Sequence, residues 1–285
     1  MPTLLSLVSD LFFSVQIQNA ARVLEWDWVN VETPEQIPAQ PPLAPRPGTP
    51  VTPQTESIAH DFIAYVVELQ PALIVVELNS HILPWEQWVL AAKTSPATRR
   101  IPILGFGPHV DADLRQRAFK AGCDAVVTKG QFSAKMVDLL QQHARLPDPA
   151  AARAAAEGEL SELARKGIEL FNRGEYFEAH EELEHAWNEE PGPARQLYQG
   201  VLQIAVAYLQ ITRSNYNGAI KMLLRARQWL DPLPDVCKGV NVAALRRDAA
   251  EVRAALESLG AEKMGEFDRS KLGPVEIVNR LNGLN

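Results

Sequence analysis

The feature that most constrains the fold is a regular alternation of short apolar runs with amphipathic stretches over the first 145 residues. The run from Leu73 to Leu78 (LIVVEL) is apolar except for one carboxylate, which is typical of a central parallel strand buried on both faces. Five such strand–helix alternations predict a doubly wound parallel sheet. The expected strands are Thr3–Val8, Trp28–Val31, Leu73–Leu78, Ile101–Phe106 and Ala125–Thr128, and the expected helices cover residues 11–26, 57–69, 85–93, 111–121 and 134–145.

A proline-rich segment, residues 33–56, interrupts this alternation. Because proline fixes φ and has no backbone N–H, we predict that the segment is an extended or disordered insertion rather than a helix or a central strand. A tolerated surface loop is one interpretation of such a long segment. A recognition segment for a signalling partner is the other.

The chain changes character after residue 145. Residues 146–158 (LPDPAAARAAAEG) begin with prolines and continue with alanines, and we interpret them as an inter-domain linker. We therefore expect an α/β domain at residues 1–145 and a second domain at residues 159–285. The second domain ends with an amphipathic helix, Asn241–Leu259, and a short tail, Gly273–Leu284.

Two pieces of the second half resemble each other. NRGEYFEAHEELEHA and RSNYNGAIKMLLRARQWL share the scheme small–aromatic–x–x–Ala, which places Ala179 and Ala219 alike. They mark two helical hairpins, residues 160–188 and 193–230, about one tetratricopeptide-like period apart. Because two repeats are too few for a solenoid, we predict a compact helical bundle. The expected fold class is thus α/β plus all-α.

Charge and composition exclude several classes of function. The net charge is −7 and the pI is near 5.5, whereas a sequence-independent nucleic-acid binder needs a basic surface. No apolar run approaches the roughly 18 residues of a membrane span, and the N-terminus lacks the basic region of a signal peptide. Cys123 and Cys237 suggest neither a disulfide framework nor a zinc cluster. We expect a cytoplasmic protein that binds neither nucleic acid nor membrane.

The first ~145 residues resemble a response-regulator receiver domain, in strand order and in local sequence. The pieces that carry the resemblance are PALIVVELNS for the third strand, RRIPILGFG for the fourth and AFKAGCDAVVTKG for the last helix–strand–lysine unit. The resemblance implies a flavodoxin-like sheet of five parallel strands. It also implies a phosphoacceptor site at the carboxyl ends of these strands.

The residues of that implied site depart from the pattern of a receiver. A glutamate, Glu77, replaces the aspartate nucleophile, and its extra methylene moves the attacking oxygen by about an ångström, enough to spoil in-line transfer. The acidic pair is reduced to Ser9 and Asp10, and Gly107 replaces the hydroxyl residue of the fourth strand. Lys129 is retained, although Gly130 replaces the proline that usually follows it.

We predict a degenerate site, a pseudo-receiver that cannot be phosphorylated, in which Glu77 and Lys129 form a fixed ion pair. Such a domain would dock a protein partner or a second copy of the chain. Genuine phosphoryl acceptance is the alternative.

A second candidate site lies in the stretch Glu175–Trp187 (EYFEAHEELEHAW), which has the spacing of an amphipathic helix. Its apolar stripe consists of Tyr176, Ala179, Leu183, Ala186 and Trp187. His180 and Glu184 stand at the border of this stripe, one turn apart. A carboxylate buried there without a partner would cost several kcal/mol, so we expect both side chains to be paired.

The next helix offers partners for this pair. Residues 193–212 are apolar on nearly every side, and their polar exceptions fall within a sector of about 80°. These exceptions are Arg195, Gln199, Gln203 and Gln210. We expect this stripe to face His180 and Glu184 in a buried network, in which Glu184 accepts from Arg195, His180 pairs with a glutamine, and Gln199 and Gln203 satisfy each other.

Three blocks, FNRGEYFEAHEELEHAW, RQLYQGVLQIAVAYLQ and NYNGAIKMLLRA, closely resemble domain-of-unknown-function family 309, over residues 160–232. Some members of that family are catalogued as predicted metal-dependent hydrolases. The resemblance thus implies a divalent metal, which His180, Glu181 and Glu184 would have to hold. The spacing matches neither H-E-x-x-H nor H-x-x-E-H, and a catalytic zinc normally has three protein ligands.

Three interpretations of this site stay open: a structural network without a cofactor, a site for a small ligand or partner, and a metal site with hydrolytic activity. The leading functional hypothesis is a non-catalytic signalling or interaction protein. A metal-dependent hydrolase centred on His180, Glu181 and Glu184 is the alternative.

Overall fold

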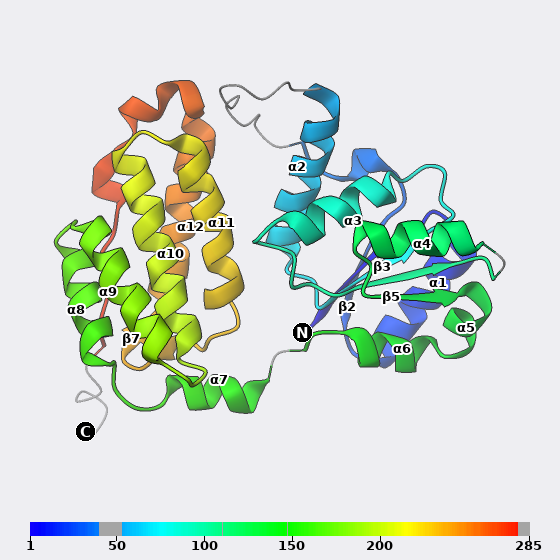
Figure 1. Ribbon diagram of the computed structural model, residues 1–285, viewed down its shortest axis with the longest axis horizontal. Coiled ribbons are helices and arrows are strands. Elements are labelled where there is room, and N and C mark those ends of the chain that lie inside the picture. The colour runs from blue at the N-terminus through cyan, green and yellow to red at the C-terminus, as the bar shows by residue number, and fades with distance from the viewer. Residues whose placement is uncertain (40–52, 110, 147, 279–285) are drawn as a thin grey trace. The chain divides into compact units, whose positions relative to one another are not determined.

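The computed structural model describes residues 1–39, 53–109, 111–146 and 148–278 (Figure 1). The chain forms two compact units, which divide between residues 146 and 147. The first unit is α/β and the second is almost entirely helical. Part of the predicted proline-rich insertion, residues 40–52, lies outside the described residues.

The first unit is built on a five-stranded parallel sheet with the order β2-β1-β3-β4-β5. This is the flavodoxin-like, doubly wound order. The predicted fold class is therefore confirmed for this half. The strands are β1 (Thr3–Leu7), β2 (Asp27–Val31), β3 (Leu73–Glu77), β4 (Ile103–Gly107) and β5 (Ala125–Thr128).

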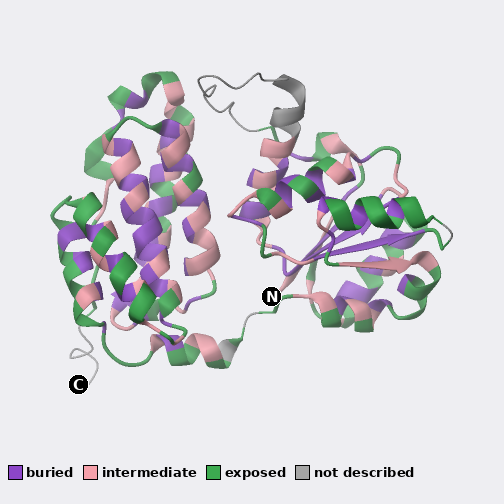
Figure 2. Ribbon diagram, viewed as in Figure 1, coloured by how far each residue is buried: buried purple, intermediate pink, exposed green. Residues whose placement is uncertain are grey.

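Helices cover both faces of the sheet, and each face has its own apolar core. The central strands β1, β3 and β4 are buried over nearly all of their length, as Figure 2 shows. On one face, Phe106 of β4 stacks on Phe132 with ring centroids 4.3 Å apart. On the other face, Phe62 stacks on Trp88 at 4.9 Å. The first face carries α1 (Leu11–Val23), α5 (Lys129–Ala134) and α6 (Met136–His143), and the second carries α2 (Pro53–Leu69), α3 (Trp85–Thr94) and α4 (Ala112–Ala121).

Two helix boundaries in this unit differ from the prediction. Helix α2 begins at Pro53 rather than at residue 57, because a proline in the first turn has no intrahelical N–H to lose. The single closing helix expected at 134–145 is two helices. Thr128 and Gln131 form a capping box that starts α5 at Lys129, well before the expected start. The proline-rich segment also contains a short 3₁₀ helix, η1 (Pro34–Gln36).

The second unit contains the two predicted helical hairpins. The first pairs α8 (Glu162–Asn172) with α9 (Tyr176–Glu189), and the second pairs α10 (Arg195–Thr212) with α11 (Tyr216–Leu230). Glycines permit close helix packing: a Cβ on Gly167 would lie 2.7 Å from Leu183 Cγ, and a Cβ on Gly200 would lie 2.7 Å from Leu230 Cγ. Helix α12 (Val242–Leu259) packs on α11.

Several short elements complete this unit. Helix α7 (Pro149–Ala156) occupies the stretch expected as a linker, and Ala156 O accepts from Lys238 N at 3.0 Å. A small hairpin, β6 (Val236–Cys237) and β7 (Val240–Asn241), was not predicted. Beyond α12 come two 3₁₀ helices, η2 (Ala261–Glu266) and η3 (Arg269–Lys271).

The chain then returns to the first hairpin. Asn172, at the end of α8, donates to Val275 O at 3.0 Å and accepts from Val275 N at 2.7 Å. Beside these two hydrogen bonds, the C-terminal segment pairs with the β6–β7 hairpin, where Val278 N donates to Gly239 O at 2.7 Å. The expected tail at 273–284 is described only as far as residue 278, and to that point it is fastened to the bundle. Among the described residues, no helix is long and apolar enough to span a membrane.

Candidate functional site

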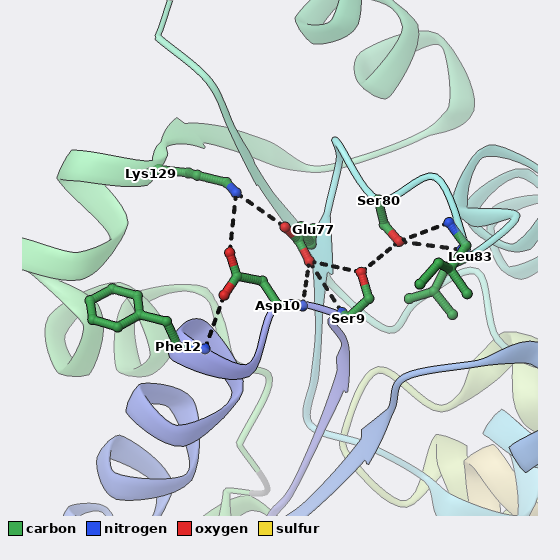
Figure 3. A network of polar contacts seen from close by, with 8 residues as sticks. Ser9, Asp10, Phe12, Glu77, Ser80, Leu83 and Lys129 are labelled. Carbon is green, nitrogen blue, oxygen red and sulfur yellow. Dashed lines mark hydrogen bonds and ion pairs between the residues drawn. The ribbon is translucent and has the colours of Figure 1, made fainter.

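The clearest polar network lies at the carboxyl edge of the sheet, where ligands bind in open α/β folds (Figure 3). The loop after β1 supplies Ser9 and Asp10, the end of β3 supplies Glu77, and the residue after β5 is Lys129. The fold thus brings these predicted site residues together. Gly107, the last residue of β4, lies at the same edge.

Glu77 is the centre of this network, with a side chain only 3% exposed. Its Oε2 accepts hydrogen bonds from the backbone N–H groups of Ser9 and Asp10, both at 3.1 Å, and from Ser9 Oγ at 3.3 Å. Its Oε1 accepts from Lys129 Nζ at 3.1 Å, so the ion pair between Glu77 and Lys129 is present. Both oxygens of this carboxylate are therefore committed to protein donors.

The carboxylate of Asp10 caps a helix and contacts a lysine, whereas in a receiver the residue at this position helps a second acid to hold a metal ion. Its Oδ1 accepts from Phe12 N at 2.9 Å and caps helix α1. Its Oδ2 lies 3.8 Å from Lys129 Nζ. Lys129 is thereby held between two carboxylates, and its ammonium lies 4.9 Å from the ring centroid of Phe13.

The network continues into the loop after β3 through a residue that the sequence analysis missed. Ser80 Oγ lies 2.8 Å from Ser9 Oγ and accepts from the backbone N–H groups of Ile82 (3.4 Å) and Leu83 (3.3 Å). Because both backbone groups donate, the Ser80 hydroxyl donates to Ser9, which in turn donates to Glu77. Through Glu77, the loops after β1 and β3 and the start of α5 form one hydrogen-bonded unit.

Gly107 is buried, and it lies opposite Thr128 in the sheet register. A Cβ placed on it would meet Leu114 Cδ2 at 3.4 Å and Leu78 Cβ at 3.5 Å, which are ordinary contact distances. Packing therefore does not exclude a serine at this position. The nearby hydroxyl of Thr128 caps α5 by accepting from Gln131 N at 3.2 Å.

The second candidate site, on α9, is more open than expected. His180 Nε2 lies 3.6 Å from Glu184 Oε2, and the two side chains are 29% and 48% exposed. Phe177, 45% exposed, lies beside His180 with ring centroids 6.3 Å apart. The pair is thus a partly solvated (i, i+4) contact on the helix surface.

The predicted network between α9 and α10 is wrong. The guanidinium of Arg195 lies 4.6 Å from the ring centroid of Trp187 instead of on Glu184. Gln203 is buried, but its Oε1 has no hydrogen-bond partner in the described part of the chain. No hydrogen bond in that part joins His180 or Glu184 to Gln199 or Gln203.

The orientation of α10 explains this result. Gly200, on the same side of α10 as Gln203, packs against Leu230 of α11. Gln210 accepts a hydrogen bond from the side chain of Asn215 at 2.7 Å, in the turn that leads to α11. Gln203 and Gln210 of the polar stripe are therefore directed toward α11, whereas Arg195 contacts α9 through Trp187.

Comparison with protein families finds a match for most of α8, for α9 and α10, and for the first part of α11. Residues 164–222 match the family described as "Domain of unknown function (DUF309)". This segment is therefore similar to the DUF309 family. The match lies inside the range 160–232 expected from the sequence blocks, and it contains His180, Glu184 and the polar stripe of α10.

One curated relative is an uncharacterized protein of Aquifex aeolicus (strain VF5). It is 28% identical over 110 residues, which are 37% of this chain and 30% of that protein. The chain therefore matches less than a third of the length of its relative.

Solved structures resemble the other half. They include the chemotaxis response regulator CheY4 of Vibrio cholerae, with 10% identity and a TM-score of 0.36 over 50% of this chain and 98% of that one. A response regulator receiver domain from Rhodospirillum rubrum has 15% identity and a TM-score of 0.34 over 50% of this chain and 97% of that one. The assignment of the fold rests on the strand order described above.

The segment that resembles DUF309 offers few ligands to a metal ion. No group of three His, Cys, Asp or Glu side chains that could hold one is found among the described residues. Glu181, the third member of the predicted set, is exposed. His180 and Glu184 alone give fewer ligands than the three of a usual catalytic zinc site.

Replacement of His180 by alanine is expected to lower the free energy of unfolding by no more than about 0.5 kcal/mol, because partly exposed (i, i+4) pairs contribute little. Urea denaturation of wild type and variant measures this difference. Elemental analysis of the same two samples is expected to show equal metal content. His185→Ala, at an exposed position of the same helix, is the control. A loss above about 1.5 kcal/mol, or metal that disappears with His180, would contradict this assignment.

Proposed function

We propose that this chain is a non-catalytic signalling or interaction protein with a degenerate receiver domain that does not accept phosphoryl groups. In this role the receiver-like half binds a protein partner or a second copy. The DUF309 half acts as a helical interaction module, and the protein works in the cytoplasm without nucleic acid or membrane. This proposal needs no cofactor.

The observation that carries the proposal is the complete engagement of the Glu77 carboxylate. An acceptor carboxylate needs an oxygen that is free to attack phosphorus in line, and a cation bound nearby to neutralise the developing charge. Here one oxygen of Glu77 is held by Lys129, and the other by two backbone N–H groups and the Ser9 hydroxyl. Asp10, the one acidic neighbour within the network, caps a helix and contacts the same lysine.

The proposal is tested by incubating the full chain with acetyl phosphate and Mg²⁺ and measuring its intact mass. We expect no mass gain, in conditions where a competent response regulator in a parallel sample gains one phosphoryl group. The Glu77→Gln variant is the matched control, since it keeps the size of the side chain and removes the acceptor. A phosphoryl group that appears on the wild type and not on this variant would overturn the proposal.

A further inference from the structure

Helix α1 has an outward face without a partner in the first unit. Its seven exposed residues fall within a sector of about 140° on the helical wheel. Four of them are apolar: Leu11, Phe12, Val15 and Val23 are 74%, 62%, 46% and 72% exposed. The other three are Gln18, Asn19 and Arg22.

This composition differs from that of another exposed helix face in the same unit. The exposed positions of α4 include Asp113, Arg115, Arg117 and Lys120, so that face is mainly charged. The face of α1 carries one charge and no acid. Contiguous exposed apolar side chains rimmed by polar groups mark interaction sites.

We propose that this face binds the same face of a second copy, with the two α1 helices antiparallel across a two-fold axis near Gln18. An isologous contact requires a surface that is complementary to itself. In this arrangement Leu11 and Phe12 of one copy pack against Val23 of the partner copy, and Val15 packs beside Asn19. The two helix dipoles are also opposed.

The charges at the two ends of α1 also favour a second copy of the chain in the antiparallel orientation. Asp10 caps the N-terminal end, and its side chain is 38% exposed. Arg22, in the last turn, is exposed and makes no ion pair within the described chain. An antiparallel pair places Arg22 of each copy near Asp10 of the other, whereas a parallel pair would place like charges together.

The size of the surface indicates a weak dimer. Helix α1 has 13 residues, and at 1.5 Å per residue it is about 20 Å long. One face of such a helix is smaller than the ~800 Å² per partner of a standard stable interface. We therefore expect dissociation in the micromolar range or above. This inference rests on the proposed interaction role. It adds that the interaction surface is the exposed face of α1 and that the partner is a second copy of the chain.

Sedimentation equilibrium of the full chain, from about 1 to several hundred micromolar, tests the association. The mass is expected to rise from the monomer value of 31.5 kDa toward twice that value. Val15→Glu brings two carboxylates together near the axis and is expected to weaken association at least about tenfold. Leu90→Glu is the matched control, because Leu90 is 51% exposed on α3, and it should leave association unchanged.

Cross-linking tests the register. Burial raises the pKa of the Cys123 thiol to about 12 and that of the Cys237 thiol to about 11, so neither native cysteine should react near neutral pH. A cysteine at the two-fold axis, Gln18→Cys, is expected to form a covalent dimer under mild oxidation. Gln116→Cys, at an exposed position of α4, should form none under the same conditions.

Three results would overturn the inference. One is a monomer at all concentrations, and another is a dimer that Val15→Glu leaves intact. The third is slow labelling of Gln18→Cys in the monomer, which would show that the same chain already covers this face. None of these results changes the phosphorylation measurement, so failure of the interface and failure of the degenerate-site proposal are distinguishable.

Discussion

Replacement of Glu77 by alanine is expected to lower the free energy of unfolding of the α/β unit by about 2–4 kcal/mol. The change removes the acceptor of two backbone N–H groups and of the Ser9 hydroxyl, and it leaves Lys129 without its closer carboxylate. Breaking a fully buried ion pair costs more, but Lys129 is 28% exposed and can be rehydrated in part.

Hydrogen exchange of the amides in β1 and β3 measures this loss, because it reports on the first unit separately from the second. Glu86→Ala is the matched control. Glu86 also pairs with a cation, Arg117 at 3.1 Å, but that pair is solvated and its loss should cost less than about 1 kcal/mol. Equal effects of the two substitutions would show that the network around Glu77 contributes no more than a surface ion pair.

Replacement of Gly200 by valine is expected to destabilise the helical unit by about 2–4 kcal/mol. A Cβ at this position collides with Leu230, whose side chain is 2% exposed and therefore cannot turn out into solvent. The α10–α11 contact must then widen, and the replacement of a helical glycine by valine, which is also a poor helix former, returns only about 0.3 kcal/mol.

Exchange of the α10 and α11 amides measures this second effect. Gly265→Ala is the control in the same unit, because a Cβ there meets no atom within 4 Å. It should be neutral. A stable Gly200→Val variant would mean that the two helices adjust to a wider spacing at little cost.

The parts of the fold that the sequence predicted are those set by continuous apolar runs. The strand around Val75 and Val76 is buried on both faces, and its short, continuous apolar run is typical of a central parallel strand. The hairpin β6–β7 was missed because strands of two residues have no measurable period. The start of α5 was missed although Thr128 and Gln131 have the spacing of a capping box.

One of the two candidate sites could be predicted from the sequence, and the contacts of the other could not. The pair of Glu77 and Lys129 could be predicted, because parallel strands place their carboxyl ends at one edge of the sheet. The helix that Gln203 faces could not be predicted. A polar stripe identifies one side of a helix, but the neighbour that this side meets depends on packing residues such as Gly200. Ser80 stands in a loop, where no periodic pattern marks it.

The hydrogen bonds between Asn172 and Val275 join residues that are 103 positions apart. In tetratricopeptide-like arrays each repeat packs on its neighbours, and the terminal repeats need a cap. Here α12 packs on α11, and the following segment returns to the end of the first helix of the array. The two hairpins are therefore capped by α12 and by the segment that follows it, which belong to the same chain. A further repeat could stack on α11 only if α12 first left that helix.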